Sequence, residues 1–545
     1  MKHLSVRMFV GVLVGAVLST FAQSNGRSRA EAGSVETTRR LDAVLAPARA
    51  ARASLDYAGA LRLLDDAARN NPDSAEVLVE RGSIFLEAED LIRAREFFEA
   101  AIRRDHSNLG ALIGLAGVDL LDRNCARAES KMRLLVARDP RNASAYSLLA
   151  RVLLEKNNTR EAAAEARRTI ALDSRNVEAL MTLAFLKARE RKPADVRAFA
   201  RRVLSLDRFN AAARRLLSQY LDGKVGYEQQ ISVDARKLFD HGRLLRQQGK
   251  ATEAIQEFEA ATAIEPRYYQ ALLALGDAWL ERGDYERAAI AAQAAESVDA
   301  DGALAQLELS YAYRGMKERA RLKIGAPDFG AMFDRRVASP KFALTREIFP
   351  DYDLLSGRGR AVIDHSVAPL AKYLPKLART GARHYLLGYD QRPSEIRGLR
   401  DYVEEGPVDG RCQDSIRGLG GRVTVSGIEY LETAATGGAH TIAHEFAHQV
   451  HLTAMSEAEL KAIHNLYRQA RRKKRALDYY AAENELEYFA QGYEAFISDY
   501  KRPAAGMTAR HTNRELFMLD PDLYSFLVKT CGTKPISSLP DAGFR

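Results

Sequence analysis

The chain has few cysteines and prolines and almost no tryptophan, and each scarcity excludes a class of protein. Three cysteines among 545 residues are too few, and odd in number, for a disulfide framework. Sixteen prolines exclude collagen-like and proline-rich chains, and a single tryptophan excludes Trp-rich binding classes. The excess of positive charge is small, since 81 Lys and Arg oppose 72 Asp and Glu, and it gives no argument for nucleic-acid binding. The composition is that of a globular protein, and the length predicts about three domains unless repeats extend the chain.

Long hydrophobic runs are also absent, apart from one near the N-terminus. Residues 8–21 read MFVGVLVGAVLSTF, an uncharged stretch after a short basic start. It is shorter than the roughly 18 apolar residues of a membrane span and is typical of the core of a secretory signal. We therefore expect a signal peptide over 1–22, cleaved after Ala22, a linker over 23–40, and an exported protein that is periplasmic or secreted. An uncleaved signal would leave the protein associated with a membrane surface.

Small and apolar residues recur every 34 residues through the first three-fifths of the chain. The recurring positions include Ala60, Leu64 and Ala67; Ala94, Phe98 and Ala101; Ala128, Met132 and Leu135; and Ala162, Ala166 and Thr169. The small residues allow two helices to approach closely, and the large ones are buried against the next unit. The period covers 41–222, breaks over 223–235 and resumes over 236–325.

This pattern resembles the tetratricopeptide repeat family, whose unit is a pair of helices joined by a turn. The resemblance implies an all-α superhelix of about seven units with a concave surface. We expect that surface to dock a protein substrate or a protein partner. The alternative is a spacer without a fixed ligand.

After the repeats the 34-residue rhythm stops, and β-branched runs appear. Arg383–Gly388 and Arg422–Ile428 read as strands. The second follows a glycine-rich segment and is a candidate edge strand that could hold an extended peptide. Residues 369–377 and the segments after Ala439 read as helices. The sequence therefore predicts an α+β domain over 326–545, which is long enough for its own core.

This domain contains the pattern His-Glu-x-x-His at positions 444–448. On a helix, His444 and His448 lie about 40° apart and one turn along, so both imidazoles reach one ion. Glu445 points beside that ion, where a bound water would lie. Two neutral nitrogen ligands and an adjacent carboxylate base are what hydrolysis at zinc requires. We therefore expect His444 and His448 to bind Zn²⁺ and Glu445 to act as the general base.

The third ligand is expected to be a carboxylate from a later helix. The metzincin pattern would require glycine and histidine where this chain has His451 and Ala454, so that class is excluded. Three acids share one edge of the following predicted helix: Glu483, Glu487 and Glu494. Periodicity alone leaves all three open.

Residues 484–490, Asn-Glu-Leu-Glu-Tyr-Phe-Ala, with the two upstream histidines, resemble the zinc peptidase domain of the anthrax lethal factor family, which includes Mlc titration factor A. The resemblance implies a zincin-like domain of the gluzincin type with Glu487 as the third zinc ligand. It also implies that Tyr480 stabilises the oxyanion, although Tyr479 is a competing candidate. Lethal factor has an acid where this chain has Gln491, so Glu494 is the candidate for contact with a ligand imidazole.

Two further features accompany the motif. His451 lies on the face of the zinc pair, and we expect it to line the cleft or to hydrogen-bond a ligand; a solvated role is the alternative. Residues 471–475 form a basic run, which is either a solvated face or a patch for an anionic lipid or polymer. Association with a membrane surface therefore stays open on this ground as well.

The sequence predicts an exported zinc metallopeptidase whose repeats dock a protein. Because every expected ligand lies within 326–545, we expect that part to fold and to cleave short peptides alone. A second peptidase class joins repeats to the same motif, but its third-ligand pattern, Glu-x-x-Ala-Asp, differs from Glu487–Gln491 at the last position. The alternative function is a non-catalytic repeat scaffold with a structural zinc domain. Glu445 argues against it, because a structural site needs no base.

Overall fold

The computed structural model describes residues 42–221, 229–337, 340–396, 398–400, 411–437, 440–502 and 511–532. The predicted signal peptide and the linker lie outside these residues, so export stays a prediction. Within the described part, no helix has the length and apolar character needed to cross a membrane.

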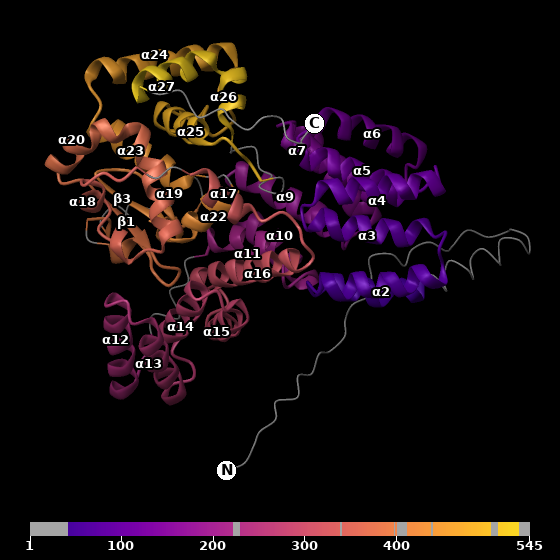
Figure 1. Ribbon diagram of the computed structural model, residues 1–545, viewed down its shortest axis with the longest axis horizontal. Coiled ribbons are helices and arrows are strands. Elements are labelled where there is room, and N and C mark those ends of the chain that lie inside the picture. The colour runs from indigo at the N-terminus through magenta and orange to yellow at the C-terminus, as the bar shows by residue number, and fades with distance from the viewer. Residues whose placement is uncertain are drawn as a thin grey trace, which may run out of the picture.

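Pairs of helices make up the first block of the structure (Figure 1). A helix over 42–53 comes first. The helices after it are α2 (Tyr57–Asn70), α3 (Ala75–Glu87), α4 (Leu91–Arg104), α5 (Leu109–Leu121), α6 (Cys125–Arg138), α7 (Ala143–Glu155), α8 (Thr159–Leu172), α9 (Val177–Arg189), α10 (Pro193–Leu206) and α11 (Ala211–Ser218). From α2 to α10, helices of 14 and 13 residues alternate, which reproduces the 34-residue unit once the two short turns are added.

The helices begin and end at regular intervals because capping and turn residues recur with the same period. One set of side chains each accepts a hydrogen bond from the backbone N–H three residues on: Ser74, Asn108, Asn142, Asn176 and Asn210. A residue with positive φ closes the turn inside each unit: Leu55, Glu89, Arg123, Asn157 and Arg191. Caps satisfy N–H groups that a helix leaves unpaired, so local sequence sets the bounds of each unit.

Phe98 shows how neighbouring helices fit together. Its side chain is almost fully buried. A Cβ atom added to Gly82 would lie 2.7 Å from the ring, and one added to Gly114 would lie 2.3 Å from it. The second block repeats the arrangement, because a Cβ atom on Gly242 would lie 2.6 Å from Phe258. Glycine at these positions lets an aromatic ring pack directly against helix backbone.

The second block confirms that the period resumes. It consists of α12 (Val233–Gln247), α13 (Ala251–Ile264), α14 (Tyr269–Glu281), α15 (Tyr285–Val298) and α16 (Ala303–Lys323). Helix α12 begins at Val233, inside the break expected over 223–235.

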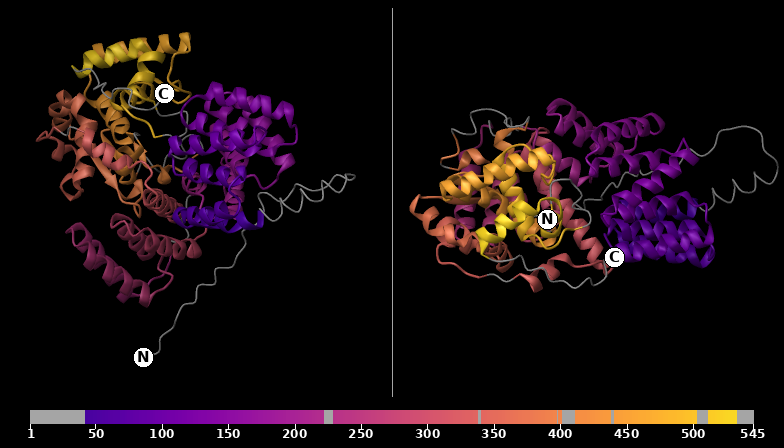
Figure 2. Two further views of the ribbon diagram at one scale, coloured as in Figure 1. Left: turned by 45° about the vertical axis from the view of Figure 1, so that its right-hand side comes forward. Right: turned by 90° about the horizontal axis from the view of Figure 1, so that it is seen from above.

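Helix α16 connects the two ends of the first block (Figures 1 and 2). Near its start, the Ser310 hydroxyl donates to the carbonyl oxygen of Ala211 at 2.8 Å. Beyond its end, Arg93 of α4 donates to the carbonyl oxygens of Ile324 and Gly325 at 3.0 and 2.8 Å. The repeat array therefore packs back on its own first helices.

The C-terminal part combines helices with a small sheet, as predicted. Its elements are α17 (Phe329–Arg336), α18 (Thr345–Ile348), η2 (Tyr352–Leu354), α19 (Gly357–Val367), η3 (Ala368–Tyr373), α20 (Leu374–Arg379), β1 (Arg383–Leu387), η4 (Pro393–Glu395), η5 (Gln413–Ser415), β2 (Gly418–Leu419), β3 (Val423–Gly427), α22 (Glu429–Gly437), α23 (Thr441–Thr453), α24 (Glu457–Lys473), α25 (Glu485–Ile497), α26 (Asn513–Leu519) and α27 (Pro521–Cys531). The helix expected over 369–377 is split into η3 and α20, each with a proline near its start.

The sheet corrects one prediction. Strand β3 pairs with β1 in parallel and with β2 in antiparallel, giving the order β1–β3–β2. Both predicted strands exist, but the prediction that Val423–Ile428 forms an edge strand is wrong, because β2 covers its outer side. Strand β2 has two residues, Gly418 and Leu419. Two residues are too few to show an alternating pattern, so nothing in the sequence indicated this strand.

The C-terminal part lies against both repeat blocks (Figure 2). Directly after β1, the ring of Tyr389 packs on Tyr311 of α16 with centroids 5.2 Å apart. In the first block, Glu89 accepts a hydrogen bond from Arg502 at 3.0 Å. Part of the repeat surface is thus covered by the chain itself.

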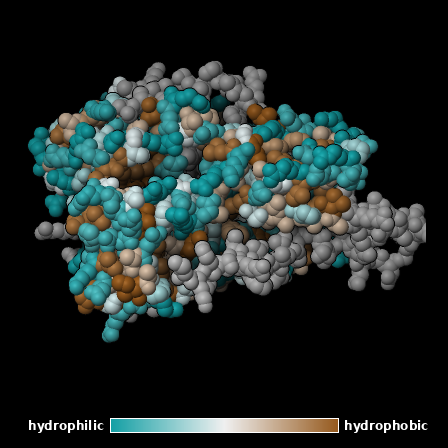
Figure 3. Space-filling view, turned by 60° about the horizontal axis from the view of Figure 1, so that its bottom comes forward, coloured by the Kyte–Doolittle hydropathy of each residue, from teal (hydrophilic) through white to brown (hydrophobic). Residues whose placement is uncertain are grey.

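On the face in Figure 3, hydrophilic side chains predominate and apolar ones form small separate groups.

Candidate metal centre

The helix that carries the motif, α23, is anchored to the sheet by its back face. Ala443, Phe446, Ala447 and Val450 have no exposed surface. The Gln449 side chain donates to the carbonyl oxygens of Arg383 and Arg422 at 3.0 and 3.1 Å, at the starts of β1 and β3. With these residues held in the core, the imidazoles of His444 and His448 both project from the other face, as the four-residue spacing predicts.

The partner helix α25 begins at a strong cap. The Asn484 side chain accepts a hydrogen bond from the backbone N–H of Glu487 at 2.9 Å. The predicted apolar residues Phe489, Tyr493 and Phe496 are buried in the core shared with α23. This packing turns Glu487 toward the two histidines.

His444, His448 and Glu487 meet at one point. The two Nε2 atoms lie 3.1 Å apart, with the rings perpendicular. The Oε2 atom of Glu487 lies 3.2 Å from Nε2 of His444 and 3.6 Å from Nε2 of His448. Among the described residues, this is the group of histidines, cysteines and acids whose ligand atoms converge closely enough to hold a metal ion.

Glu494 lies behind the group, where the sequence suggested a supporting acid. Its Oε2 atom is 3.5 Å from Nδ1 of His444, on the opposite side of the ring from Glu487. Burial alone would lower the pKa of His444, but hydrogen bonds with Glu487 and Glu494 raise it well above its usual value. The pKa of Glu487 shifts in the opposite direction. Burial alone would raise it, but hydrogen bonds with the two histidines hold it well below the usual range. The carboxylates therefore orient and polarise the His444 ring.

Glu445 is buried beside the two histidines. Loss of hydration on burial raises the pKa of its carboxyl group, and the neighbouring histidines oppose that rise. Strand β2 lies directly over it: a Cβ atom on Gly418 would be 2.4 Å from Oε1 of Glu445. A Cβ atom on Gly420 would be 2.2 Å from Cβ of His448. Two glycines thus allow the edge of the sheet to approach the centre.

The other acids of this region are used elsewhere. Glu483 forms an ion pair with Arg191 of the repeat array. Glu485 accepts a hydrogen bond from His464 of α24 at 2.7 Å. Of the three acids that periodicity left open, Glu487 lies on the histidine pair and Glu494 lies behind it.

The two tyrosines differ in their surroundings. The ring of Tyr479 lies beneath Arg189 of α9 at 4.6 Å and is 41% exposed. Tyr480 is partly buried, and its backbone N–H donates to Asp478 at 2.8 Å. The role of Tyr480 at the oxyanion stays a prediction.

His451 is buried rather than solvated. Its ring meets the ring of Phe489 edge to face with centroids 5.3 Å apart. Burial lowers the pKa of His451 to about 4, so the ring is neutral at ordinary pH. It lies one turn beyond His448 and packs between α23 and α25. Gln491, where lethal factor has an acid, is buried as well.

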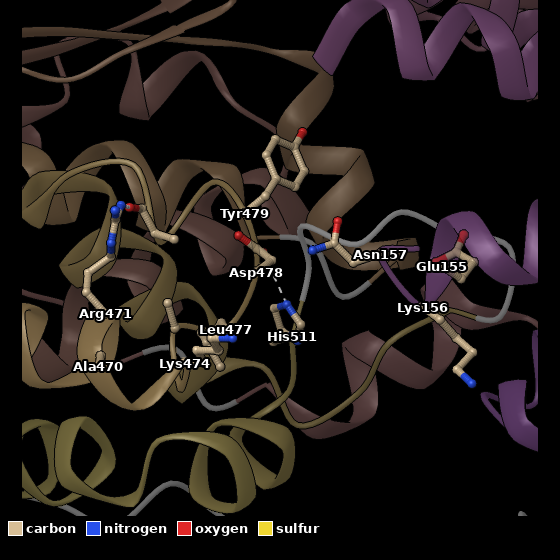
Figure 4. A pocket seen from close by; sticks show the side chains of 12 residues that line it. Glu155, Lys156, Asn157, Ala470, Arg471, Lys474, Leu477, Asp478, Tyr479 and His511 are labelled. Atoms are coloured by element: carbon tan, nitrogen blue, oxygen red, sulfur yellow. Dashed lines mark hydrogen bonds and ion pairs between the residues drawn. The ribbon is translucent and has the colours of Figure 1, made fainter. Parts of the chain in front are cut away.

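A cavity of about 440 Å³ lies between the repeats and the C-terminal part (Figure 4). Its lining includes Glu155, Lys156 and Asn157 from the end of α7 and the turn after it, and Arg471, Lys474, Asp478, Tyr479 and His511 from the C-terminal part. Residues 471–474 of the basic run are exposed, as expected of a solvated face, and Arg471 and Lys474 also border this cavity. Sequence reasoning missed the cavity, since its two walls are some 300 residues apart.

All three cysteines are free thiols, including Cys412 and Cys531.

Comparison with known proteins concerns the repeats. The family described as tetratricopeptide repeat matches residues 45–108, 122–177 and 239–313. No curated protein matches the chain. Solved structures with which it shares weak likeness include YrrB, described as a TPR protein with an unusual peptide-binding site, at 18% identity over 38% of this chain and 93% of that chain, with a TM-score of 0.21.

Two further solved structures share a similarly weak likeness with this chain. MamA 41-end from Desulfovibrio magneticus RS-1 has 19% identity over 31% of this chain and 96% of that one, with a TM-score of 0.23. A thermophilic TPR protein from Thermus thermophilus, TTC0263, has 17% identity over 38% of this chain and 100% of that one, with a TM-score of 0.25. The family match, the 34-residue period and the helix pairs agree: the chain carries a tetratricopeptide repeat array, a structure typical of protein-interaction scaffolds.

Proposed function

We propose that the protein is an exported zinc-dependent metallopeptidase that hydrolyses peptide bonds, with repeats that dock a protein substrate or partner. The observation that carries the proposal is the convergence of the Nε2 atoms of His444 and His448 with Oε2 of Glu487, beside the buried carboxyl group of Glu445. Export rests on the predicted signal peptide over 1–22.

The spacing of these atoms fits zinc. A tetrahedral ion with bonds of about 2.0–2.1 Å holds its ligand atoms about 3.3–3.4 Å apart. The three separations here are 3.1, 3.2 and 3.6 Å. Two imidazole nitrogens and one carboxylate favour zinc over calcium or magnesium, which prefer oxygen ligands. Such a set leaves a fourth position for water.

When bound, zinc would supply a Lewis acid that lowers the pKa of that water toward about 7. The chain's own groups would then move the protons. Glu445 would accept a proton from the water as its oxygen attacks the carbonyl carbon, and would give that proton to the amine nitrogen as the C–N bond breaks. Its position next to His444 in the chain, buried but outside the group of converging ligand atoms, suits that role. Tyr480 donates a hydrogen bond to the oxyanion of the intermediate.

Strand β2 is suited to hold the substrate. It is the edge of the described sheet, and the site of an extended peptide moves from β3, where the sequence placed it, to β2. An extended peptide pairs with such an edge through main-chain hydrogen bonds. Gly418 and Gly420 bring this edge against Glu445 and His448, so a peptide paired there would run past the centre.

Metal analysis of purified variants tests the ligand set. Wild type should hold close to one zinc per chain, and Glu487→Ala should lose it. Glu483→Ala and Glu485→Gln are matched controls on the same segment, because their carboxylates pair with Arg191 and His464. A site that stays full in Glu487→Ala and empties in Glu483→Ala contradicts the assignment.

The non-catalytic scaffold is the second candidate. The repeat array favours it, because such arrays are used to bind proteins. The two candidates differ in one result. If Glu445→Gln retains the cellular role of the protein while zinc content is unchanged, the scaffold is favoured.

A further inference from the structure

We infer that the repeat array is part of the working centre: it fixes the two chain segments that lead into β2 and into α25, with Arg215 and Arg191 as positioning residues. The inference rests on the proposed function for its kinetic consequence, although its structural consequence can be measured without activity. It replaces the expectation that residues 326–545 cleave short peptides unaided.

The first segment, 411–417, leads directly into β2. It is hydrogen-bonded to the end of the first repeat block at two points. The backbone N–H of Cys412 donates to the carbonyl oxygen of Gln219 at 3.0 Å. The Ser415 hydroxyl donates to the carbonyl oxygen of Leu221 at 2.7 Å. The residues just before the strand are thus attached to the repeats.

Arg417 connects this attachment to the sheet. Its buried guanidinium forms two hydrogen bonds with Glu429, at 3.1 and 2.9 Å. It also donates to the carbonyl oxygens of Leu387 and Gly388, at the end of β1. The next residue is Gly418, which lies on Glu445. A change in the position of Arg417 therefore moves the strand that covers the proposed base.

Arg215 is the residue of the repeats that joins this network. It lies on α11 and donates to the Tyr430 hydroxyl at 2.9 Å. It also lies 3.8 Å from Glu429, whose side chain is fully buried. Glu429 is therefore held between Arg417, which directly precedes β2, and Arg215 of the repeats. A buried carboxylate that loses part of its compensation shifts or draws in water, and Arg417 would move with it.

The second segment, 476–484, carries Tyr480 and ends at Asn484, the cap of α25. The turn after α9 holds it: Arg191 pairs with Glu483, and Arg189 lies over the ring of Tyr479 at 4.6 Å. Asp478 fixes the interior by accepting hydrogen bonds from the backbone of Tyr480 and Ala481, both at 2.8 Å. Glu487 follows three residues after this segment, so the repeats also bear on the start of its helix.

The repeat array offers Arg123 as a control for Arg191. Arg123 has the same positive φ in the equivalent turn two units earlier and is exposed. Arg214, next to Arg215, serves as a second control, because its side chain bonds to partners within the repeats: the Arg208 carbonyl oxygen, Glu296 and Gln306. Replacing Arg214 therefore disturbs the array without removing a hydrogen bond to either segment.

The structural test is backbone hydrogen exchange in the full chain. In Arg215→Met, amides of 411–420 should exchange about tenfold faster than in wild type, while Arg214→Met leaves them unchanged there. In Arg191→Glu, amides of 478–484 should exchange faster, and the charge swap Arg191→Glu with Glu483→Arg should restore protection. Unchanged exchange in both single variants overturns the inference, as does a swap that restores nothing.

The kinetic test uses zinc-loaded full-length protein and a quenched-fluorescent peptide that wild type cleaves. Arg215→Met should lower kcat by about tenfold or more at nearly constant KM and zinc content, because a small displacement of reacting groups is costly. Arg191→Glu should lower kcat by about threefold to tenfold, as an exposed pair contributes less, and the charge swap should recover most of it. Arg123→Glu should match wild type. Wild-type kcat in Arg215→Met overturns the inference. A wild type that cleaves nothing instead refutes the proposed function, and hydrogen exchange still decides the anchoring.

Discussion

The Nε2 atoms of His444 and His448 lie 3.1 Å apart, and Oε2 of Glu487 is within 3.6 Å of both. Two imidazole nitrogens this close to each other and to a carboxylate share either a proton or a cation. The four-residue spacing on α23 brings the nitrogens together, and α25 adds the carboxylate from another helix. Donor type and spacing both match zinc.

Removing the support behind His444 should weaken metal binding without abolishing it. Glu494 faces Nδ1 of His444 at 3.5 Å. We expect Glu494→Gln to reduce zinc affinity by about 10- to 100-fold, the usual effect of losing a partner that orients a ligand histidine. Competition with a chromogenic chelator measures this. Glu485→Gln on the same helix is the control. Equal affinity in Glu494→Gln and wild type would show that the acid plays no part.

Adding one methyl group to Gly420, the residue after β2, should disturb the centre. A Cβ atom on Gly420 would lie 2.2 Å from Cβ of His448, an atom fixed to the helix backbone, so the strand must move. We expect Gly420→Ala to lower peptide hydrolysis by at least about tenfold and to lower the thermal midpoint. Gly357→Ala, where a Cβ atom meets nothing within 4 Å, should leave both unchanged. Full activity in Gly420→Ala would mean that β2 does not border the working site.

The repeat core makes its own prediction. Phe98 is almost fully buried against Gly82 and Gly114. Phe98→Ala should lower the free energy of unfolding by about 3–5 kcal/mol, as for other large buried rings. Phe517→Ala, at a ring that is 57% exposed, should lower it far less. Urea unfolding followed by circular dichroism gives both values. A loss below about 1 kcal/mol in Phe98→Ala would contradict the packing described.

The free energy of unfolding should depend on pH through Glu308, a buried residue of α16. Both carboxylate oxygens of Glu308 lack a hydrogen-bond partner in the described part of the protein. Loss of hydration on burial, with the charges of Asp277 and Asp390, raises the pKa of Glu308 well above its usual value. The folded protein therefore holds this proton more tightly than the unfolded chain does, and the free energy of unfolding falls as pH rises from about 4.3 toward the raised value.

Glu308→Gln removes the group that titrates. The variant should be more stable than wild type at about pH 8 and nearly equal to it at about pH 4. Thermal midpoints at both values measure the difference, with the exposed Glu259→Gln as control. A Glu308→Gln variant that is less stable than wild type at the higher pH would contradict the assignment of a raised pKa to this buried carboxyl group.

Local patterns made much of this structure readable from sequence. The 34-residue period determined the helix pairs, because caps such as Asn142 and turn residues such as Asn157 act within a few residues of themselves. The spacing of His444 and His448 is equally local, since a helix alone brings them together. The start of α25 was predicted two residues too early, at Glu483, because the cap at Asn484 was not recognised; Glu483 lies before the helix.

Long-range contacts were not readable. Periodicity left Glu483, Glu487 and Glu494 equivalent, and Glu483 is distinguished by Arg191, 292 residues earlier in the chain. Strand β2 produced no signal because two residues show no alternation. The attachment of Cys412 and Ser415 to the repeats depends on main-chain oxygens of Gln219 and Leu221, which sequence does not distinguish from any others.

Peptide hydrolysis by the zinc-loaded full chain, with wild type and Glu445→Gln side by side, is the measurement that decides whether the centre is catalytic. The substitution keeps the size of the side chain and removes the base. Zinc content should be nearly unchanged, because Glu445 is not among the converging ligand atoms, while hydrolysis of labelled casein and of a mixed peptide library should fall by about 10²- to 10⁴-fold. If the zinc-loaded wild type cleaves no member of the library, or if Glu445→Gln cleaves as fast as wild type, the proposed peptidase activity is contradicted.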